Sequence, residues 1–182
     1  MDNTIDRLTY SYSNARKSWE TWCFLVNLDL KTTNDKILKY VENNELLQHF
    51  RFLSFKDFHI ELYKILKDSR NNQDNIFRLL RDIPNTDERK NNTDKRLAEL
   101  TEHLEFINKL LDTRDKYYAH LDKDYEKHIK EGRTVNDIYY LFQCVEQAII
   151  ALTSLEYLTS HLDKIPSRDE FTLNTYDCEK IQ

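Results

Sequence analysis

The segment LAELTEHLEFINKLLDTRDKYYAHL, residues 97–121, carries the strongest helical pattern in this 182-residue chain. Its apolar residues recur at alternating steps of three and four, which is the spacing of one face of an α-helix. The residues on this face are Leu97, Leu100, Leu104, Ile107 and Leu111. The same spacing then reaches Arg114, Tyr118 and Leu121. The segment therefore predicts a long amphipathic helix whose last turns are polar and aromatic.

The same periodicity elsewhere in the chain predicts an all-α protein. Apolar stripes cover residues 5–26, 37–50, 55–65, 76–80 and 135–152. The chain has one glycine and two prolines, and 32% of its residues are charged, a composition that favours long helices over sheets. We expect an up-and-down bundle of four to five main helices in one domain, residues 1–165. Residues 166–182 lose the pattern, and we expect them to form a peripheral or mobile tail.

Capping residues predict where several of these helices begin. Asn34 or Asp35 can cap the second helix, because either side chain can accept a hydrogen bond from a free backbone N–H. The sequence SFKD at residues 54–57 resembles a capping box and predicts the start of another helix. Thr134 is expected to begin the last long helix. Loops are expected at residues 31–34, 84–92 and 122–133.

Charge, hydropathy and cysteine content limit the partners and the compartment. The formal net charge is −5 at pH 7, so the chain has no global attraction to nucleic acid or to an anionic membrane, and an RNA site would need a local basic patch. No run approaches the ~18 apolar residues of a membrane span, and the N-terminus does not resemble a secretory signal. Cys23, Cys144 and Cys178 are far apart, which favours buried thiols in a reducing compartment. We therefore expect a soluble, cytoplasmic protein.

Arg114 stands on the stripe where the five preceding positions hold Leu or Ile. A guanidinium keeps its charge, and burying it without a partner costs several kcal/mol. Arg114 therefore needs a carboxylate from elsewhere in the bundle, a hydrated cleft or an anionic ligand. Alternatively, the stripe reaches solvent at this point and the arginine needs no partner.

Arg114 and Asp115, followed by four residues and His120, resemble the motif of the HEPN superfamily. That motif is an arginine, usually followed by a polar residue, with a histidine a few positions later. The longer string Arg-Asp-Lys-Tyr-Tyr-Ala-His-Leu-Asp is similar to the version in abortive-infection proteins of the AbiU class. The order of helices and loops over residues 5–160 also resembles that class, although only the motif is specific.

The resemblance implies a metal-independent endoribonuclease in a toxin or phage-defence role. An imidazole near neutral pH can take a proton from the 2′-hydroxyl of RNA and give one to the leaving oxygen. An arginine can hold the phosphate with paired donors while charge develops on its oxygens. His120 would then be the acid/base, Arg114 the phosphate clamp, and Asp115 a residue that orients or tunes one of them.

The spacing of Arg114 and His120 argues against a site within one regular helix. On an ideal helix, an offset of six residues rotates the two side chains by about 120° and separates them by ~9 Å along the axis. Either the helix is distorted within the motif, or a second chain completes each site. HEPN proteins usually pair with their motifs facing each other, so the resemblance implies a homodimer.

Basic and aromatic residues in and after the motif are candidate RNA contacts. Lys116, Tyr117, Tyr118 and Lys123 could follow a single strand and stack on its bases, although the acids among them also fit a solvated charged face. The six histidines never occur at the spacings with which helical bundles share a metal, so we expect no metal and no other cofactor. RNA is the expected substrate, and a cognate antitoxin is a further partner consistent with a toxin.

Two alternatives to a nuclease remain open at this stage. The chain could be a HEPN-fold module that binds RNA or dimerises without catalysis. It could also be a generic helical bundle in which the arginine and the histidine coincide by chance.

Overall fold

The computed structural model describes residues 2–31, 35–69, 72, 75–120 and 134–162, and these ranges form eight α-helices and no strand. The all-α class expected from the sequence is confirmed. The helices are α1 Asp2–Lys31, α2 Asp35–Asn43, α3 Glu45–Leu66, α4 Ile76–Arg81, α5 Lys90–Glu102, α6 Leu104–His120, α8 Val135–Leu152 and α9 Leu155–Leu162. Five of them, α1, α3, α5, α6 and α8, have 13 residues or more, as a bundle of four to five main helices requires.

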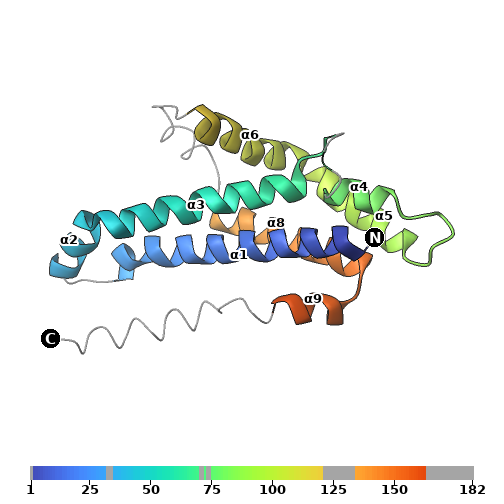
Figure 1. The fold of residues 1–182 in the computed structure, drawn as a ribbon, viewed down its shortest axis with the longest axis horizontal. Helices are drawn as coiled ribbons and strands as arrows, with labels where there is room; N and C mark the ends of the chain where they lie inside the picture. The colour runs from blue at the N-terminus through green and yellow to red at the C-terminus, as the bar shows by residue number, and fades with distance from the viewer. Residues whose placement is uncertain (1, 32–34, 70–71, 73–74, 121–133, 163–182) are drawn as a thin grey trace.

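The long helices run up and down beside one another (Figure 1). Helix α1 and helix α3 pack along their lengths in opposite directions, and α8 lies behind them in this view. Helix α6 packs on α3 and runs opposite to it, whereas the short α9 packs on α1. Helix α3 therefore lies between α1 and the segment that carries the motif.

Aromatic side chains from three helices form the centre of the core. The ring of Phe58 on α3 lies 4.8 Å from the ring of Trp19 on α1 and 6.0 Å from that of Phe142 on α8. Tyr12 on α1 contacts Phe142 edge to face at 5.9 Å. All four side chains are buried. Edge-to-face and tilted ring contacts of this kind favour one relative position of the helices, so the core fixes where α3 presents its other face to α6.

The break expected within residues 45–66 is absent, and the capping box expected at 54–57 is wrong. Helix α3 continues through Ser54 without interruption and begins at Asn44 instead, whose side chain accepts a hydrogen bond from the Leu47 N–H at 3.1 Å. The aromatic ring of Phe55 lies 5.0 Å from that of Trp22 on α1. This tertiary packing keeps residues 54–57 helical despite their capping-type sequence.

The long stripe at residues 97–121 belongs to two helices rather than to one. Helix α5 ends at Glu102, and the N–H of His103 closes its last turn on the Leu100 carbonyl at 3.2 Å. Leu104, which the stripe places in the core, is exposed at the start of α6. Helix α5 packs on α4 and α8, whereas α6 packs on α3. The break therefore redirects the motif segment from one part of the bundle to another.

Other boundaries agree with the sequence. Thr134 begins α8 with a capping box, in which its side chain accepts from the Asp137 N–H at 3.2 Å and the Asp137 carboxylate accepts from the Thr134 N–H at 2.9 Å. Helix α4 ends before Pro84, as expected, whereas α5 begins at Lys90 and takes up the last three residues of the expected loop. The expected loop at 122–133, the tail at 166–182 and Cys178 lie outside the described residues.

The structure also tests the predictions about the cysteines and about membrane spans. Cys23 and Cys144 are buried, as the sequence predicts. None of the described helices combines the length and the apolar character that a bilayer crossing requires.

Candidate functional site

Arg114 lies on the α3-facing part of α6, where the apolar stripe ends. Ile107, Leu110 and Leu111 precede it and are buried, and Thr113 is buried beside it with its hydroxyl donating to the Lys109 carbonyl at 2.9 Å. Arg114 itself is half-buried. Arg114 is therefore neither buried in the core nor fully exposed to solvent.

The guanidinium of Arg114 lies over an aromatic ring of the neighbouring helix. Its Cζ is 4.4 Å from the centroid of the Tyr63 ring on α3. An aromatic face carries partial negative charge and attracts a cation without accepting a conventional hydrogen bond. The ring thus supports the arginine in a half-buried position.

A second cation uses the same ring. The Nζ atom of Lys67, at the C-terminal end of α3, lies 5.5 Å from the centroid of Tyr63. Tyr63 and Lys67 are four residues apart on α3, so both side chains fall on one face of that helix. The sequence analysis did not identify either residue. Their spacing of four residues can be read from the sequence, but nothing in the sequence indicates that this face of α3 packs against α6.

The helix that carries the motif is regular. Helix α6 remains α-helical from Leu104 to His120, so the distortion considered from the sequence is absent from the backbone. A rotation of about 120° and a rise of ~9 Å therefore separate Arg114 from His120. Helix α6 runs back toward the middle of α3, and in this view its C-terminal end lies farther from α3 than its start does (Figure 1).

The other predicted site residues follow Arg114 in the chain. The side chains of Asp115, Lys116, Tyr117, Tyr118 and His120 lie outside the described part of the structure, and so does the whole of Lys123. Only Arg114 among the predicted residues can therefore be placed with its contacts. Within the described ranges, no three His, Cys, Asp or Glu side chains come together as a metal site would require.

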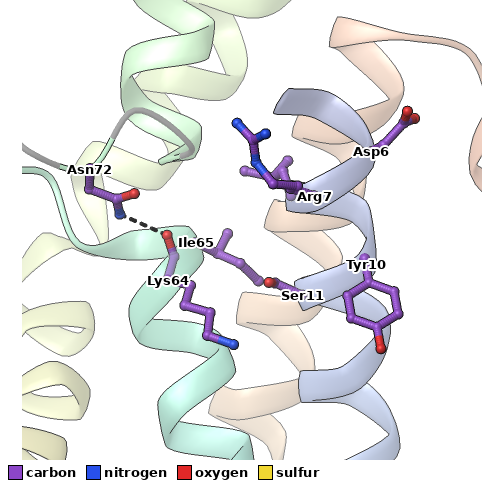
Figure 2. A pocket seen from close by; sticks show the side chains of 8 residues that line it. Asp6, Arg7, Tyr10, Ser11, Lys64, Ile65 and Asn72 are labelled. Atoms are coloured by element: carbon purple, nitrogen blue, oxygen red, sulfur yellow. Dashed lines mark hydrogen bonds between the residues drawn. The ribbon is translucent and has the colours of Figure 1, made fainter. Parts of the chain in front are cut away.

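A pocket of about 570 Å³ lies on another side of α3, between its C-terminal end and the start of α1. Figure 2 shows Arg7 on α1 and Lys64 on α3 at this pocket, together with Asn72. The ammonium of Lys64 pairs with Glu61 at 2.6 Å. The Asn72 side chain donates to the carbonyls of Lys64 and Lys67 at 2.8 and 3.1 Å. Asn72 therefore ties the following loop to the end of α3, and the pocket contains none of the predicted site residues.

The contacts around Arg114 thus bring one arginine, one lysine and one tyrosine ring together where α3 and α6 meet. This group places two cations on one aromatic ring. It contains no described nucleophile or general base. No family model matches the chain, and no curated protein or solved structure matches it significantly.

Proposed function

We propose that the protein is a metal-independent endoribonuclease of the HEPN type, with a toxin or phage-defence role, acting as a homodimer. In this proposal His120 transfers protons, Arg114 holds the scissile phosphate, and Asp115 orients or tunes one of the two. A proton-transferring imidazole and a fixed cation are together sufficient to open the RNA backbone at the 2′-hydroxyl, leaving a cyclic phosphate.

The position of Arg114 is the observation that carries this proposal. A permanent cation follows three buried apolar positions on α6 and lies half-buried on the Tyr63 ring. A cation fixed in this way loses little conformational entropy when it binds a phosphate, which favours electrostatic stabilisation of a transition state. The motif residue His120 lies on the same helix, at its C-terminal end.

The regular geometry of α6 supports the dimer part of the proposal. Because the backbone of the motif helix is undistorted, positions 114 and 120 of one chain lie on different faces of α6. A site that needs both groups on one phosphate can obtain one of them from a second chain. A two-fold axis near the C-terminal half of α6 would supply both sites at once.

Cleavage of RNA in EDTA tests the catalytic proposal. The wild-type protein should cleave single-stranded RNA with excess chelator present, and H120A should lower the rate by about 10²-fold or more, as expected for loss of a general acid/base. R114A should do likewise, because it removes the phosphate clamp. H49A is the matched control, since His49 is an exposed histidine on α3, and it should cleave like the wild type.

The same assay separates the alternatives. Binding of RNA by the wild type without cleavage would favour a non-catalytic HEPN-fold module. Cleavage that survives in H120A would contradict the assignment of the acid/base. Neither binding nor cleavage would favour a helical bundle with a coincidental motif.

A further inference from the structure

The first half of α3 is apolar on its solvent side as well as on its core side. Leu46 and Phe50 are 60% and 46% exposed, and Leu53 follows one turn later, half-buried. Steps of four and three place these side chains on one face of the helix, which we call the α3 apolar face. On the opposite side, Phe55 packs on Trp22 of α1. A helix that is apolar on all sides is normally buried on all sides, so the α3 apolar face indicates a partner beyond the described part of the chain.

Two charged residues, Glu45 and Lys56, lie beside the α3 apolar face. Their separation of 11 residues corresponds to three full turns and about 20°, so both lie on the same flank of this face. The rise between them is ~16 Å, which is too far for an ion pair within one chain. Neither forms an ion pair with any of the described residues. The flank therefore presents one acidic and one basic group, each able to pair with another molecule.

The charges and the leucines are symmetric about the same point of α3. In an antiparallel pair of identical helices, a residue faces its counterpart that lies equally far from the two-fold axis on the other side, and the same flank of both helices lies on one side of the pair. The midpoint of Glu45 and Lys56 falls between residues 50 and 51, and that of Leu46 and Leu53 falls between residues 49 and 50. These midpoints are about 1.5 Å apart along the helix. One axis near Phe50 therefore brings each leucine against a leucine and each glutamate against a lysine.

We propose that the α3 apolar face is a self-association surface, occupied by the same face of a second copy in antiparallel orientation. A two-fold contact requires a surface that is complementary to itself, and opposite charges beside it fix the register of the two helices. Tyr63, the residue on which Arg114 lies, is rotated by about 100° from Leu46 around α3. The surface is thus separate from the contact between α3 and α6, and the inference goes beyond the nuclease proposal without depending on it.

Sedimentation equilibrium of the full chain tests the apolar part of the surface. A contact between two short helix segments is smaller than a standard interface, so association should be weak, and the loading concentrations should reach about 100 μM. The wild type should associate reversibly. L46D should raise the dissociation constant about 10-fold or more, because it places a charge in the apolar contact of both copies.

L155D is the matched control for L46D. Leu155 is 63% exposed in the first turn of α9, just as Leu46 is 60% exposed in the first turn of α3. An acidic residue is favourable in the first turn of a helix, so both variants should fold. L155D should associate like the wild type. A wild type that stays monomeric at every concentration would overturn the inference, and so would an L155D effect as large as that of L46D.

Charge reversal tests the pairing of Glu45 with Lys56 of the second copy. In E45K both flank positions are basic, and in K56E both are acidic, so each variant alone should associate about 10-fold less tightly than the wild type. An equal mixture of the two should regain association, because the mixed pair joins opposite charges at both edges. Circular dichroism melting establishes that each variant folds. Unchanged association of the single variants, or no gain on mixing, would overturn the antiparallel pairing.

Vesicle flotation and the mass of the assembly separate this inference from its competitors. Binding to vesicles of phosphatidylcholine and phosphatidylserine that is lost in L46D, without self-association of the wild type, would overturn the choice of a second copy. A dimer that becomes monomeric in L46D, or a tetramer that becomes dimeric, would support the surface. Either result holds whether or not the wild type cleaves RNA, so failure of the nuclease proposal leaves the surface supported.

Discussion

Tyr12, Arg16 and Glu146 connect the first helix to the last long one. The Tyr12 hydroxyl donates to Oε2 of Glu146 at 2.8 Å, and Nη1 of Arg16 donates to the same oxygen at 3.0 Å. Burial raises the pKa of the Tyr12 hydroxyl above its ordinary value, so Tyr12 remains a protonated donor at physiological pH. A charge-assisted hydrogen bond at a buried position contributes more than an exposed pair of the same groups.

We predict that Y12F lowers the free energy of unfolding by about 1.5 kcal/mol, because it removes the buried hydroxyl that donates to Glu146, although the Arg16 donor remains. Urea unfolding monitored by circular dichroism measures the effect, with an unchanged m-value expected. Y10F is the control, since Tyr10 is 68% exposed on the same helix. Equal stabilities of Y12F and Y10F would show that the hydroxyl contributes nothing.

Asp87 and Arg89 attach the loop before α5 to the end of α8. The Arg89 guanidinium and backbone N–H both donate to the Asp87 carboxylate, and they lower the pKa of Asp87 from 3.8 to about 2. Arg89 also donates to the Leu152 carbonyl at 2.8 Å. Because the folded-state pKa is depressed, the ionised carboxylate stabilises the fold above pH 3.8, and this contribution is lost as the pH falls through about 2.

The D87N variant tests this pH dependence. At neutral pH it should unfold at a lower urea concentration than the wild type, and the difference between the two should shrink as the pH falls from 3.8 toward 2. The measurement is a series of urea titrations across that range. A difference that stays constant down to pH 2 would mean that Asp87 is not held ionised by Arg89.

Of the residues at the candidate site, the sequence could identify some and not others. The apolar spacing singled out Arg114, because a cation that follows leucines and isoleucines at helical spacing can be recognised from the sequence alone. Tyr63 and Lys67 could not be found in that way. They lie about fifty positions earlier on α3, and their role depends on which face of α3 meets α6.

Among the helices, one predicted cap is confirmed and another is wrong. Thr134 caps α8 as expected, whereas residues 54–57 cap no helix and α3 is capped by Asn44, which the sequence analysis did not identify. The difference is tertiary: the rings of Phe55 and Phe58 pack on Trp22 and Trp19 of α1, which holds this part of α3 in the helix. A local motif cannot reveal contacts made with a distant helix.

Alanine substitutions at the observed cap, Asn44, and at the wrongly expected cap, Ser54, should therefore differ. N44A should cost about 1 kcal/mol, because the Leu47 N–H loses its acceptor. S54A should change stability by less than about 0.5 kcal/mol, since alanine is favourable inside a helix. Thermal melts of both variants measure the effects. A larger loss in S54A than in N44A would contradict the continuity of α3 through residue 54.

The main error in the predicted helices is the single long helix over residues 97–121, because the structure has a break at His103. The periodic stripe continues in phase across residues 97–111, so the sequence predicts one helix there. The structure has two helices, because α5 is committed to α4 and α8 while α6 is committed to α3. The ring of His103 packs at 5.0 Å on Tyr140 of α8, beside the break. The spacing of apolar residues does not show which neighbouring helix each turn contacts.

At the scale of the whole molecule, the all-α class and the number of main helices followed from composition and periodicity. The order of neighbours did not, since it depends on side-chain packing between distant segments. The proposed dimer belongs to this scale as well, because the regular α6 separates the two motif residues of one chain.

Mixing inactive variants tests whether two chains share each site. If each site takes Arg114 from one chain and His120 from the other, mixed dimers of R114A and H120A contain one intact site. An equal mixture that exchanges freely should then recover about one quarter of the wild-type cleavage rate. No recovery, although differently tagged chains exchange, would mean that each chain forms its own site.

The contact between α1 and α8 has a consequence for protein synthesis. Residues 12 and 146 bond to each other across 134 positions of sequence, and Phe142 completes the aromatic centre begun by Tyr12 and Phe58. While a ribosome is still translating the middle of the message, the face of α1 that belongs against α8 has no partner and stays open to water. Any message cut before the codons for α8 would therefore yield a product with an exposed aromatic face, which aggregates or is recognised by chaperones.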